Sequence, residues 1–223
     1  MVGSVNGLTC LAMEDYDLVM WNPSIRKYKK LPDSRPRLKK LTYDFHSYGF
    51  GYDEFHDDYK VVGIFTCGSL DQVEFKIFSL KSDSWTSVIG CLSGVLLNVL
   101  GKFVNGKLHW ATMAPGANRC MFGNIISFDL ADEKWENVEL PCYGGDEIAL
   151  FWLGLLGSDL SIICDRRGTH VDVWVMKRSI GLQNLGQRCL SSSILMIKWI
   201  IPVFHPFSCQ MKVKFWLYLD QLS

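Results

Sequence analysis

The sequence lacks any pair of closely spaced cysteines. Its eight cysteines lie at least 20 residues apart, so a zinc site or a redox motif of the Cys-x-x-Cys type has no local support. Several of them fall inside apolar stretches, where a free thiol packs as a small hydrophobic side chain. The spacing therefore predicts reduced cysteines, which are typical of a protein of the cytoplasm or the nucleus.

The chain also lacks an excess of charge, a membrane-spanning run and a secretory leader. Lysine and arginine number 23, and aspartate and glutamate also number 23, which removes a general attraction to nucleic acid or to an anionic membrane. The apolar run at residues 195–204 is too short and too interrupted to cross a membrane, and could be a strand pair or a buried helix. Acidic residues at positions 14, 15 and 17 follow the first apolar residues too closely for a signal peptide. We therefore expect no nucleic acid and no membrane as partners.

Catalytic signatures are missing as well. No Gly-x-Ser-x-Gly elbow, phosphate-binding loop or His-Glu-x-x-His motif occurs. Cys164 and His170 could be paired as nucleophile and base, and His46 and His56 could be grouped with nearby carboxylates as a metal site. A buried strand thiol and polar loop residues explain them more simply, and His109 is expected to be a core histidine because its neighbours are apolar. The sequence predicts no enzyme, no cofactor and no metal.

What the sequence does contain is one pattern that occurs three times at intervals of 50 and 57 residues. An aromatic residue is followed by Asn, Ser or Asp and then by Pro or Leu, and a second aromatic residue stands seven positions after the first. The aromatic pairs are Trp21 and Tyr28, Phe78 and Trp85, and Phe128 and Trp135. A unit that recurs at such intervals indicates a repeat architecture.

Each copy of the pattern predicts a β-hairpin. Alternating apolar residues give the strands, and the side chain of Asn22, Ser79 or Asp129 can cap the turn. The second aromatic residue is expected to wedge between neighbouring sheets. Asn6-Gly7 and Asn105-Gly106 are further hairpin signals, and about thirteen strands are expected up to residue 176. The predicted fold is all-β, a partial β-propeller-like array of about three to four small antiparallel sheets.

The last 46 residues differ from this pattern. Residues 171–177 read as the first half of a fourth copy, but no second half is recognisable after them. Residues 178–223 contain six charged residues, of which only Asp220 is acidic. The predicted organisation is a truncated domain at residues 1–177 and a divergent tail at residues 178–223, for which a frame change or a retained intron would be one origin.

A basic segment from Arg26 to Lys40 contains eight lysines and arginines among fifteen residues. A surface that binds nucleic acid would interleave aromatic residues among the basic ones, and only Tyr28 does so here. A solvated connecting loop is therefore the favoured interpretation.

Five segments of the chain resemble the signatures of the plant F-box-associated domain, which occurs in F-box proteins of the kelch-like and S-locus types. They follow the family's order and cover about residues 2 to 177. The five are residues 22–32, residues 48–53 with 58–62, residues 103–110, residues 126–130 and residues 172–177.

The resemblance implies a non-catalytic role. In this family the propeller-like domain captures a substrate protein, and an amino-terminal F-box docks on the adaptor of an SCF ubiquitin ligase. No F-box precedes Val2, so this chain is expected to reach the SCF adaptor only if an F-box is supplied elsewhere. The family would also continue after Lys177 with a Trp-based hairpin, so an open arc of sheets is expected.

The sequence does not identify the substrate protein, and the residues that would bind it are unknown because nothing in the sequence says which rim of the array is used. The alternative is a gene remnant or an incorrect gene model without a stable fold.

Overall fold

The computed structural model describes most of the chain up to residue 178 and two later segments. The described residues are 1–13, 17–34, 45–67, 69–90, 92, 94–97, 99–113, 123–138, 150–165, 170–178, 194–202 and 214–217. They form strands and turns, and none of them belongs to a helix that is long and apolar enough to span a membrane. The chain divides into two compact units, Met1–Gly116 with Gly123–Leu140, and Ala117–Phe122 with Pro141–Ser223.

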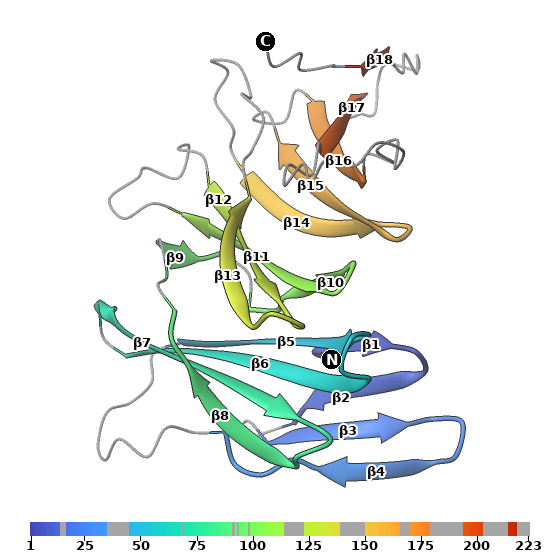
Figure 1. The fold of residues 1–223 in the computed structure, drawn as a ribbon. Coiled ribbons are helices and arrows are strands. Elements are labelled where there is room, and N and C mark those ends of the chain that lie inside the picture. Colours follow the sequence, from blue (N-terminus) through green and yellow to red (C-terminus); the bar gives the residue numbers. More distant parts are fainter. Residues whose placement is uncertain are drawn as a thin grey trace, which may run out of the picture. The chain divides into compact units, whose positions relative to one another are not determined.

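The first unit contains three antiparallel sheets (Figure 1). The first sheet consists of β1 (Gly3–Val5), β2 (Leu8–Ala12), β3 (Leu18–Asn22) and β4 (Lys27–Lys30), in that order. The second consists of β5 (Phe45–Asp53), β6 (Asp58–Cys67), β7 (Ser69–Ser79) and β8 (Ser84–Val88). The third consists of β10 (Lys102–Val104), β11 (Lys107–Met113), β12 (Gly123–Asp129) and β13 (Lys134–Val138), and the short β9 (Val95–Leu96) also pairs with β11.

The three copies of the aromatic pattern are the last hairpins of these sheets. The two aromatic residues of each copy stand directly opposite each other: Trp21 and Tyr28, Phe78 and Trp85, Phe128 and Trp135. Each hairpin closes through four turn residues, of which the last has a left-handed backbone, with φ of 53° at Arg26, 52° at Asp83 and 55° at Glu133. This turn length explains the spacing of seven, and the predicted hairpins are confirmed.

The residue that ends the first strand of each of these hairpins caps the turn, as predicted. Asn22 Oδ1 accepts a hydrogen bond from the backbone N–H of Ser24 at 3.1 Å. Asp129 Oδ1 accepts one from Ala131 at 2.9 Å and one from Asp132 at 3.1 Å. These bonds satisfy backbone groups that the turn would otherwise leave to water, so the side chain fixes the turn.

The Asn-Gly dipeptides also form hairpin turns. Asn6 and Gly7 have φ of 48° and 77°, and Asn105 and Gly106 have φ of 53° and 77°. Two consecutive positive φ angles define the two-residue type I′ turn, whose twist matches that of the flanking strands. The turns join β1 to β2 and β10 to β11.

Buried apolar side chains fill both faces of the second sheet, because neighbouring residues of a strand point to opposite faces. Val61 and Phe78 pack toward the first sheet, whereas Val62 and Ile77 pack toward the third. The layer shared with the first sheet contains Val2, Cys10, Leu18, Met20, Leu31, Tyr48, Phe50, Val61, Phe65 and Phe78. The layer shared with the third contains Val62, Ile64, Phe75, Ile77, Leu92, Leu96, Leu108, Trp110, Ile126, Phe128 and Leu130. The second sheet is therefore held between its two neighbours.

The expectation that the second aromatic residue wedges between sheets is confirmed for two copies and wrong for the first. The ring centroid of Trp135 lies 4.8 Å from that of Phe75 in the second sheet and 4.7 Å from that of Phe128 in its own sheet. Trp85 packs against the layer between the first and second sheets. Tyr28, by contrast, is 76% exposed, because it lies on the face of the first sheet that points away from the second.

The second unit contains a fourth antiparallel sheet. Its strands are β14 (Leu150–Leu156), β15 (Asp159–Asp165), β16 (His170–Arg178), β17 (Ile194–Pro202) and β18 (Lys214–Leu217), in that order. The prediction of an all-β array of small antiparallel sheets is thereby confirmed. Sixteen strands lie in the described residues up to 178, more than the thirteen expected, since strands as short as β9 are too short to show an alternating pattern.

Two further strands follow the half copy at residues 171–177, although the residue opposite Trp174 is Lys198 and not a second aromatic. Strand β17 pairs with β16 over its whole length, from Ile194 opposite Arg178 to Pro202 opposite His170, and β18 pairs with β17. The pattern was not recognisable because 15 residues separate β16 from β17, where the other copies have four-residue turns. The domain boundary at residue 177 and the origin of the tail stay predictions.

Candidate protein-binding surface

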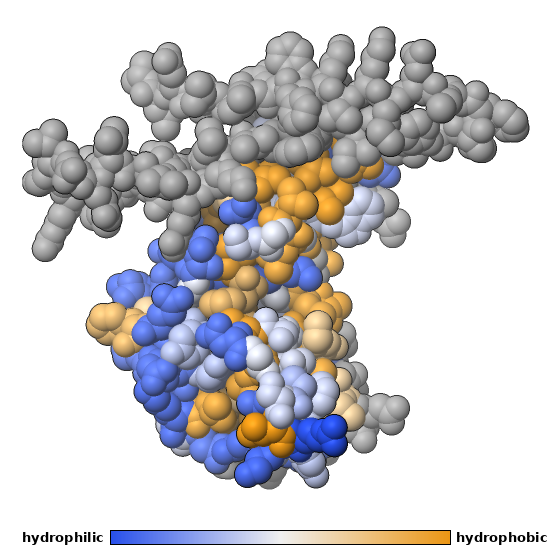
Figure 2. Space-filling model, turned by 90° about the vertical axis from the view of Figure 1, so that its right-hand side faces the viewer, coloured by the Kyte–Doolittle hydropathy of each residue, from blue (hydrophilic) through white to orange (hydrophobic). Residues whose placement is uncertain are grey.

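The short turns of the first unit lie on one rim. In a meander of four strands, the first and third turns lie at the same end of the sheet, and contacts between sheets bring these ends together. Lys81 Nζ of the β7–β8 turn donates a hydrogen bond to the carbonyl of His56 in the β5–β6 turn at 2.7 Å. Lys29 of β4 forms an ion pair with Asp83 of the β7–β8 turn at 2.8 Å. Figure 2 views the molecule from the side of these turns and shows hydrophobic residues scattered among hydrophilic ones.

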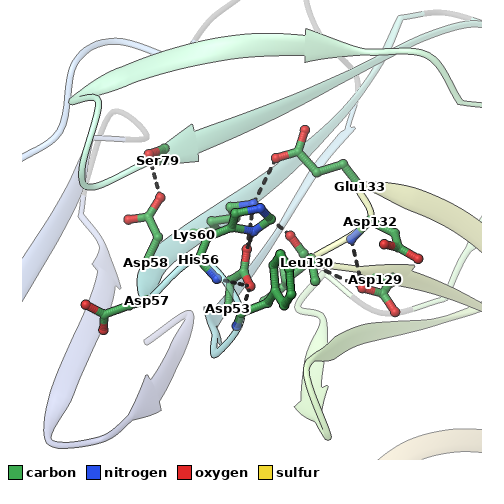
Figure 3. A network of polar contacts seen from close by, with 12 residues as sticks. Asp53, His56, Asp57, Asp58, Lys60, Ser79, Asp129, Leu130, Asp132 and Glu133 are labelled. Carbon is green, nitrogen blue, oxygen red and sulfur yellow. Dashed lines mark hydrogen bonds and ion pairs between the residues drawn. The ribbon is translucent and has the colours of Figure 1, made fainter.

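A buried ion pair fixes this rim between the second and third sheets (Figure 3). Lys60 Nζ of β6 contacts three oxygen atoms: Asp53 Oδ2 at 2.9 Å, Glu133 Oε1 at 2.9 Å and the carbonyl oxygen of Leu130 at 2.7 Å. The Lys60 side chain is only 6% exposed and that of Asp53 is fully buried. Since an ammonium has three N–H donors, all of them are satisfied, and the β12–β13 turn is bound to the second sheet.

The carboxylate of Asp53 also organises its own turn. Its Oδ1 accepts hydrogen bonds from the backbone N–H groups of Phe55 at 3.0 Å and His56 at 3.1 Å, and the Nδ1 atom of His56 lies 2.6 Å from Oδ2. Burial by itself raises the pKa of Asp53, but the bonds from Lys60 and His56 outweigh it, so the pKa lies below its usual value. Burial by itself lowers the pKa of Lys60, but the bonds to Glu133 and Asp53 outweigh burial, so this pKa lies above its usual value. Both groups are therefore charged at neutral pH.

His109 is buried on β11, as the sequence predicts for a core histidine. It is 8% exposed, and its Nδ1 atom lies 3.2 Å from the Lys102 carbonyl, which can only accept a hydrogen bond. Burial lowers the pKa of His109 from 6.5 to about 4. The imidazole is therefore neutral and carries its proton on Nδ1.

Burial of neutral His109 predicts a loss of stability in mild acid. The unfolded chain takes up a proton near pH 6.5 and the folded chain only near pH 4, so the free energy of unfolding should fall as the pH drops through this range. A shift of this size corresponds to roughly 3 kcal/mol when complete. Urea unfolding at several pH values should show a smaller fall for His109→Gln than for the wild type. Equal falls would contradict the burial of a neutral imidazole. The carboxylates that titrate in the same range are present in both proteins, so their contribution cancels in the comparison.

The histidines considered for a metal site are not brought together. His46 and His56 belong to opposite ends of the β5–β6 hairpin, since His46 is the second residue of β5 and His56 lies in the turn after this strand. In the described part of the chain, no group of three or more histidine, cysteine, aspartate or glutamate side chains is placed to hold a metal ion.

Two cysteine side chains that the structure describes are part of the packed interior. Cys10 and Cys164 are fully buried thiols, and burial raises the pKa of Cys10 to about 12. The register of β15 and β16 places Cys164 opposite Asp172. The side chain of His170 lies outside the described residues, as do residues 35–40 of the basic segment.

The first sheet leaves one face open beside the rim. Trp21 is 40% exposed and Tyr28 76%, and they stand opposite each other on the face that points away from the second sheet. Arg26 and Lys27, next to Tyr28 in the sequence, are also exposed. Sequence reasoning identified the aromatic pair but missed both its exposure and the ion pair of Lys60. The only signal for the latter was a lysine next to the apolar run of β6.

The chain is similar to known F-box proteins over most of its length. The model of the F-box associated beta propeller domain matches residues 1–209. The F-box/kelch-repeat protein At3g23880 of Arabidopsis thaliana is 35% identical over 182 residues, covering 79% of this chain and 48% of the relative. F-box protein CPR1 of the same plant is 34% identical over 200 residues, covering 78% and 48%.

The chain thus spans about half the length of the curated relatives it matches. The family match also extends past residue 177 and includes β17. The resemblance seen in the sequence is confirmed, and the chain belongs to the family of F-box associated beta propeller domains.

Proposed function

We propose that this chain is a substrate-recognition module of an SCF ubiquitin ligase, which holds a target protein while other subunits modify it. The observation that carries this proposal is the match of residues 1–209 to a domain of F-box proteins. The partners are then the target protein and, through an F-box, the SCF adaptor. The buried, reduced thiols of Cys10 and Cys164 agree with a site of action in the cytoplasm or the nucleus.

The structure supports a binding role through rigidity. Sheets that are packed face to face hold the turns of the rim, and each turn is fixed by side chains such as Asp53 and Asp129. Phe55 and Ile25 are exposed at two of these turns. A preorganised surface loses little conformational entropy when a partner binds, and exposed aromatic side chains are frequent anchors in interfaces. Capture of this kind needs no bond to be made or broken.

The test uses the complete chain fused behind an F-box and expressed in plant cells. The matched control carries substitutions in the F-box that abolish binding to the adaptor. We expect at least one protein that binds both fusions and whose half-life is shortened only by the intact one, with proteasome inhibition restoring it. Folded fusions that shorten the half-life of no bound protein would contradict the proposal.

A further inference from the structure

We propose that the outer edge of the first sheet binds an acidic, extended segment of the captured protein as an additional strand along β4. This inference rests on the proposed function and names the part of the domain that makes the contact. The edge consists of Arg26, Lys27, Tyr28, Lys29 and Lys30, and Trp21 lies opposite Tyr28.

The backbone of β4 has hydrogen-bonding groups to offer. In the described residues β4 pairs with β3 alone and is the last strand of its sheet. The N–H of Leu31 donates to the carbonyl of Leu18 at 2.8 Å. Along an edge strand, residues whose backbone N–H and C=O groups point toward the neighbouring strand alternate with residues whose groups point away from it. The backbone groups of Lys29 and Lys27 therefore also point toward β3. The N–H and C=O groups of Tyr28 and Lys30 therefore point outward, where an added strand would pair with them.

The charge of the edge favours an acidic partner. Two of its cations are already paired, Lys29 with Asp83 at 2.8 Å and Lys30 with Asp17. No described carboxylate forms an ion pair with Arg26 or Lys27, although both are exposed. Carboxylates of a partner would complete this set and would also speed its association.

Protection against aggregation does not explain these lysines. Lysine on an edge strand often serves to prevent pairing with another chain, and β8 and β13 are the equivalent outer strands of the second and third sheets. Three of the four residues of β4 are lysines, whereas β8 has no charged residue and β13 has one lysine and one glutamate. If the fold needed guarded outer edges, all three strands would be charged. The lysines of β4 therefore point to a role that the other two edges lack.

The open face beside β4 is also unlike the faces that sheets cover. In the second and third sheets, the first aromatic residues of the pattern are Phe78 and Phe128. On the preceding strand, Val61 stands opposite Phe78 and Leu108 opposite Phe128, and both are fully buried against a neighbouring sheet. The first sheet has Thr9 there, opposite Trp21; Thr9 is also buried, and its hydroxyl donates a hydrogen bond to Ser4 Oγ at 3.3 Å. Tyr28 and Trp21 then serve as the aromatic anchors of the contact.

An added strand must match both faces of β4. Tyr28 lies on the open face with Trp21, whereas Lys27 and Lys29 lie on the opposite face, because side chains alternate along a strand. The segment that fits alternates acidic residues with apolar or small ones. Its acidic side chains would lie beside the lysines and its other side chains on Trp21 and Tyr28.

The test uses a fluorescein-labelled peptide, Glu-Val-Glu-Thr-Glu-Ile-Glu-Ser, and the complete chain. Fluorescence anisotropy should show saturable binding that weakens with added salt. Lys27→Glu should weaken it by about tenfold or more. The matched control is Lys134→Glu, which reverses the equivalent first residue of β13 and should leave the affinity unchanged within about twofold. In hydrogen exchange, the bound peptide should protect the amides of Tyr28 and Lys30.

The outcomes separate this inference from the proposed function. No saturable binding up to about 1 mM, equal effects of the two substitutions, or no protection of Tyr28 and Lys30 would each overturn it. A dimer of the chain that buries Tyr28 would overturn it too, since a second copy would then occupy the face. If a captured protein is destabilised by the F-box fusion and Lys27→Glu does not change this, only the β4 inference fails. If the peptide binds as expected and no protein is destabilised, the proposed function fails.

Discussion

Replacing Lys60 with methionine should lower the free energy of unfolding by about 3 to 5 kcal/mol. The substitution leaves the fully buried carboxylate of Asp53 without its ammonium, and also removes the contacts to Glu133 and to the Leu130 carbonyl. The cost comes mainly from the charge left buried, because an unpaired carboxylate in a low-dielectric environment is far less stable than one in water. Urea unfolding at neutral pH, with the slope and midpoint analysed separately, measures the effect.

Two further variants test the origin of this cost. Lys107→Met removes a lysine that pairs with Asp129 and Glu136 within the third sheet and is partly exposed, so it should cost less than about 1 kcal/mol. Asp53→Asn added to Lys60→Met should restore part of the lost stability, because no buried charge then remains. If Lys60→Met costs no more than Lys107→Met, the ion pair does not hold the two sheets as described.

Replacing Trp135 with alanine should cost about 3 to 5 kcal/mol, whereas Tyr28→Ala should change the free energy of unfolding by less than about 0.5 kcal/mol. The two residues occupy the same position of the repeated hairpin. Trp135 contacts Phe75 of the neighbouring sheet, with ring centroids 4.8 Å apart, while Tyr28 is 76% exposed. The difference between the two losses of free energy therefore measures the packing between sheets, because both substitutions remove the same aromatic position of a hairpin.

The same unfolding curves also decide whether the chain is a stable domain. A single cooperative transition for the wild type would argue against a gene remnant without a fold. Equal losses for Trp135→Ala and Tyr28→Ala would contradict the packing of the third sheet on the second.

The local structure of the hairpins could be predicted from the sequence because short-range chemistry determines it. A side chain such as Asn22 or Asp129 caps its own turn, and a turn of fixed length places two aromatic residues opposite each other. The Asn-Gly turns follow from the same kind of local preference. None of these features depends on which sheet lies next to which.

The ion pair of Lys60 could not be predicted, because its partners lie far apart in the chain. Glu133 follows Lys60 by 73 residues, and the two meet only because the third sheet packs on the second. The exposure of Tyr28 has the same cause: the pattern is common to three hairpins, and only the position of the first sheet in the array leaves its outer face open. The apolar run of β17 could be interpreted from the sequence as strand or as helix, because 15 residues separate it from β16 and no hairpin pattern links the two.

The most direct test of this account is a nuclear Overhauser measurement on the ring protons of Trp135. The central claim is that the aromatic pair of a hairpin fills the seam between its own sheet and the preceding one. We predict cross-peaks from Trp135 to Phe128 in the same sheet and to Phe75 in the second sheet. The ring centroids are 4.7 Å apart in the first case and 4.8 Å apart in the second. A cross-peak to Phe128 without one to Phe75 would show an intact hairpin that does not pack on its neighbour, and would contradict the claim.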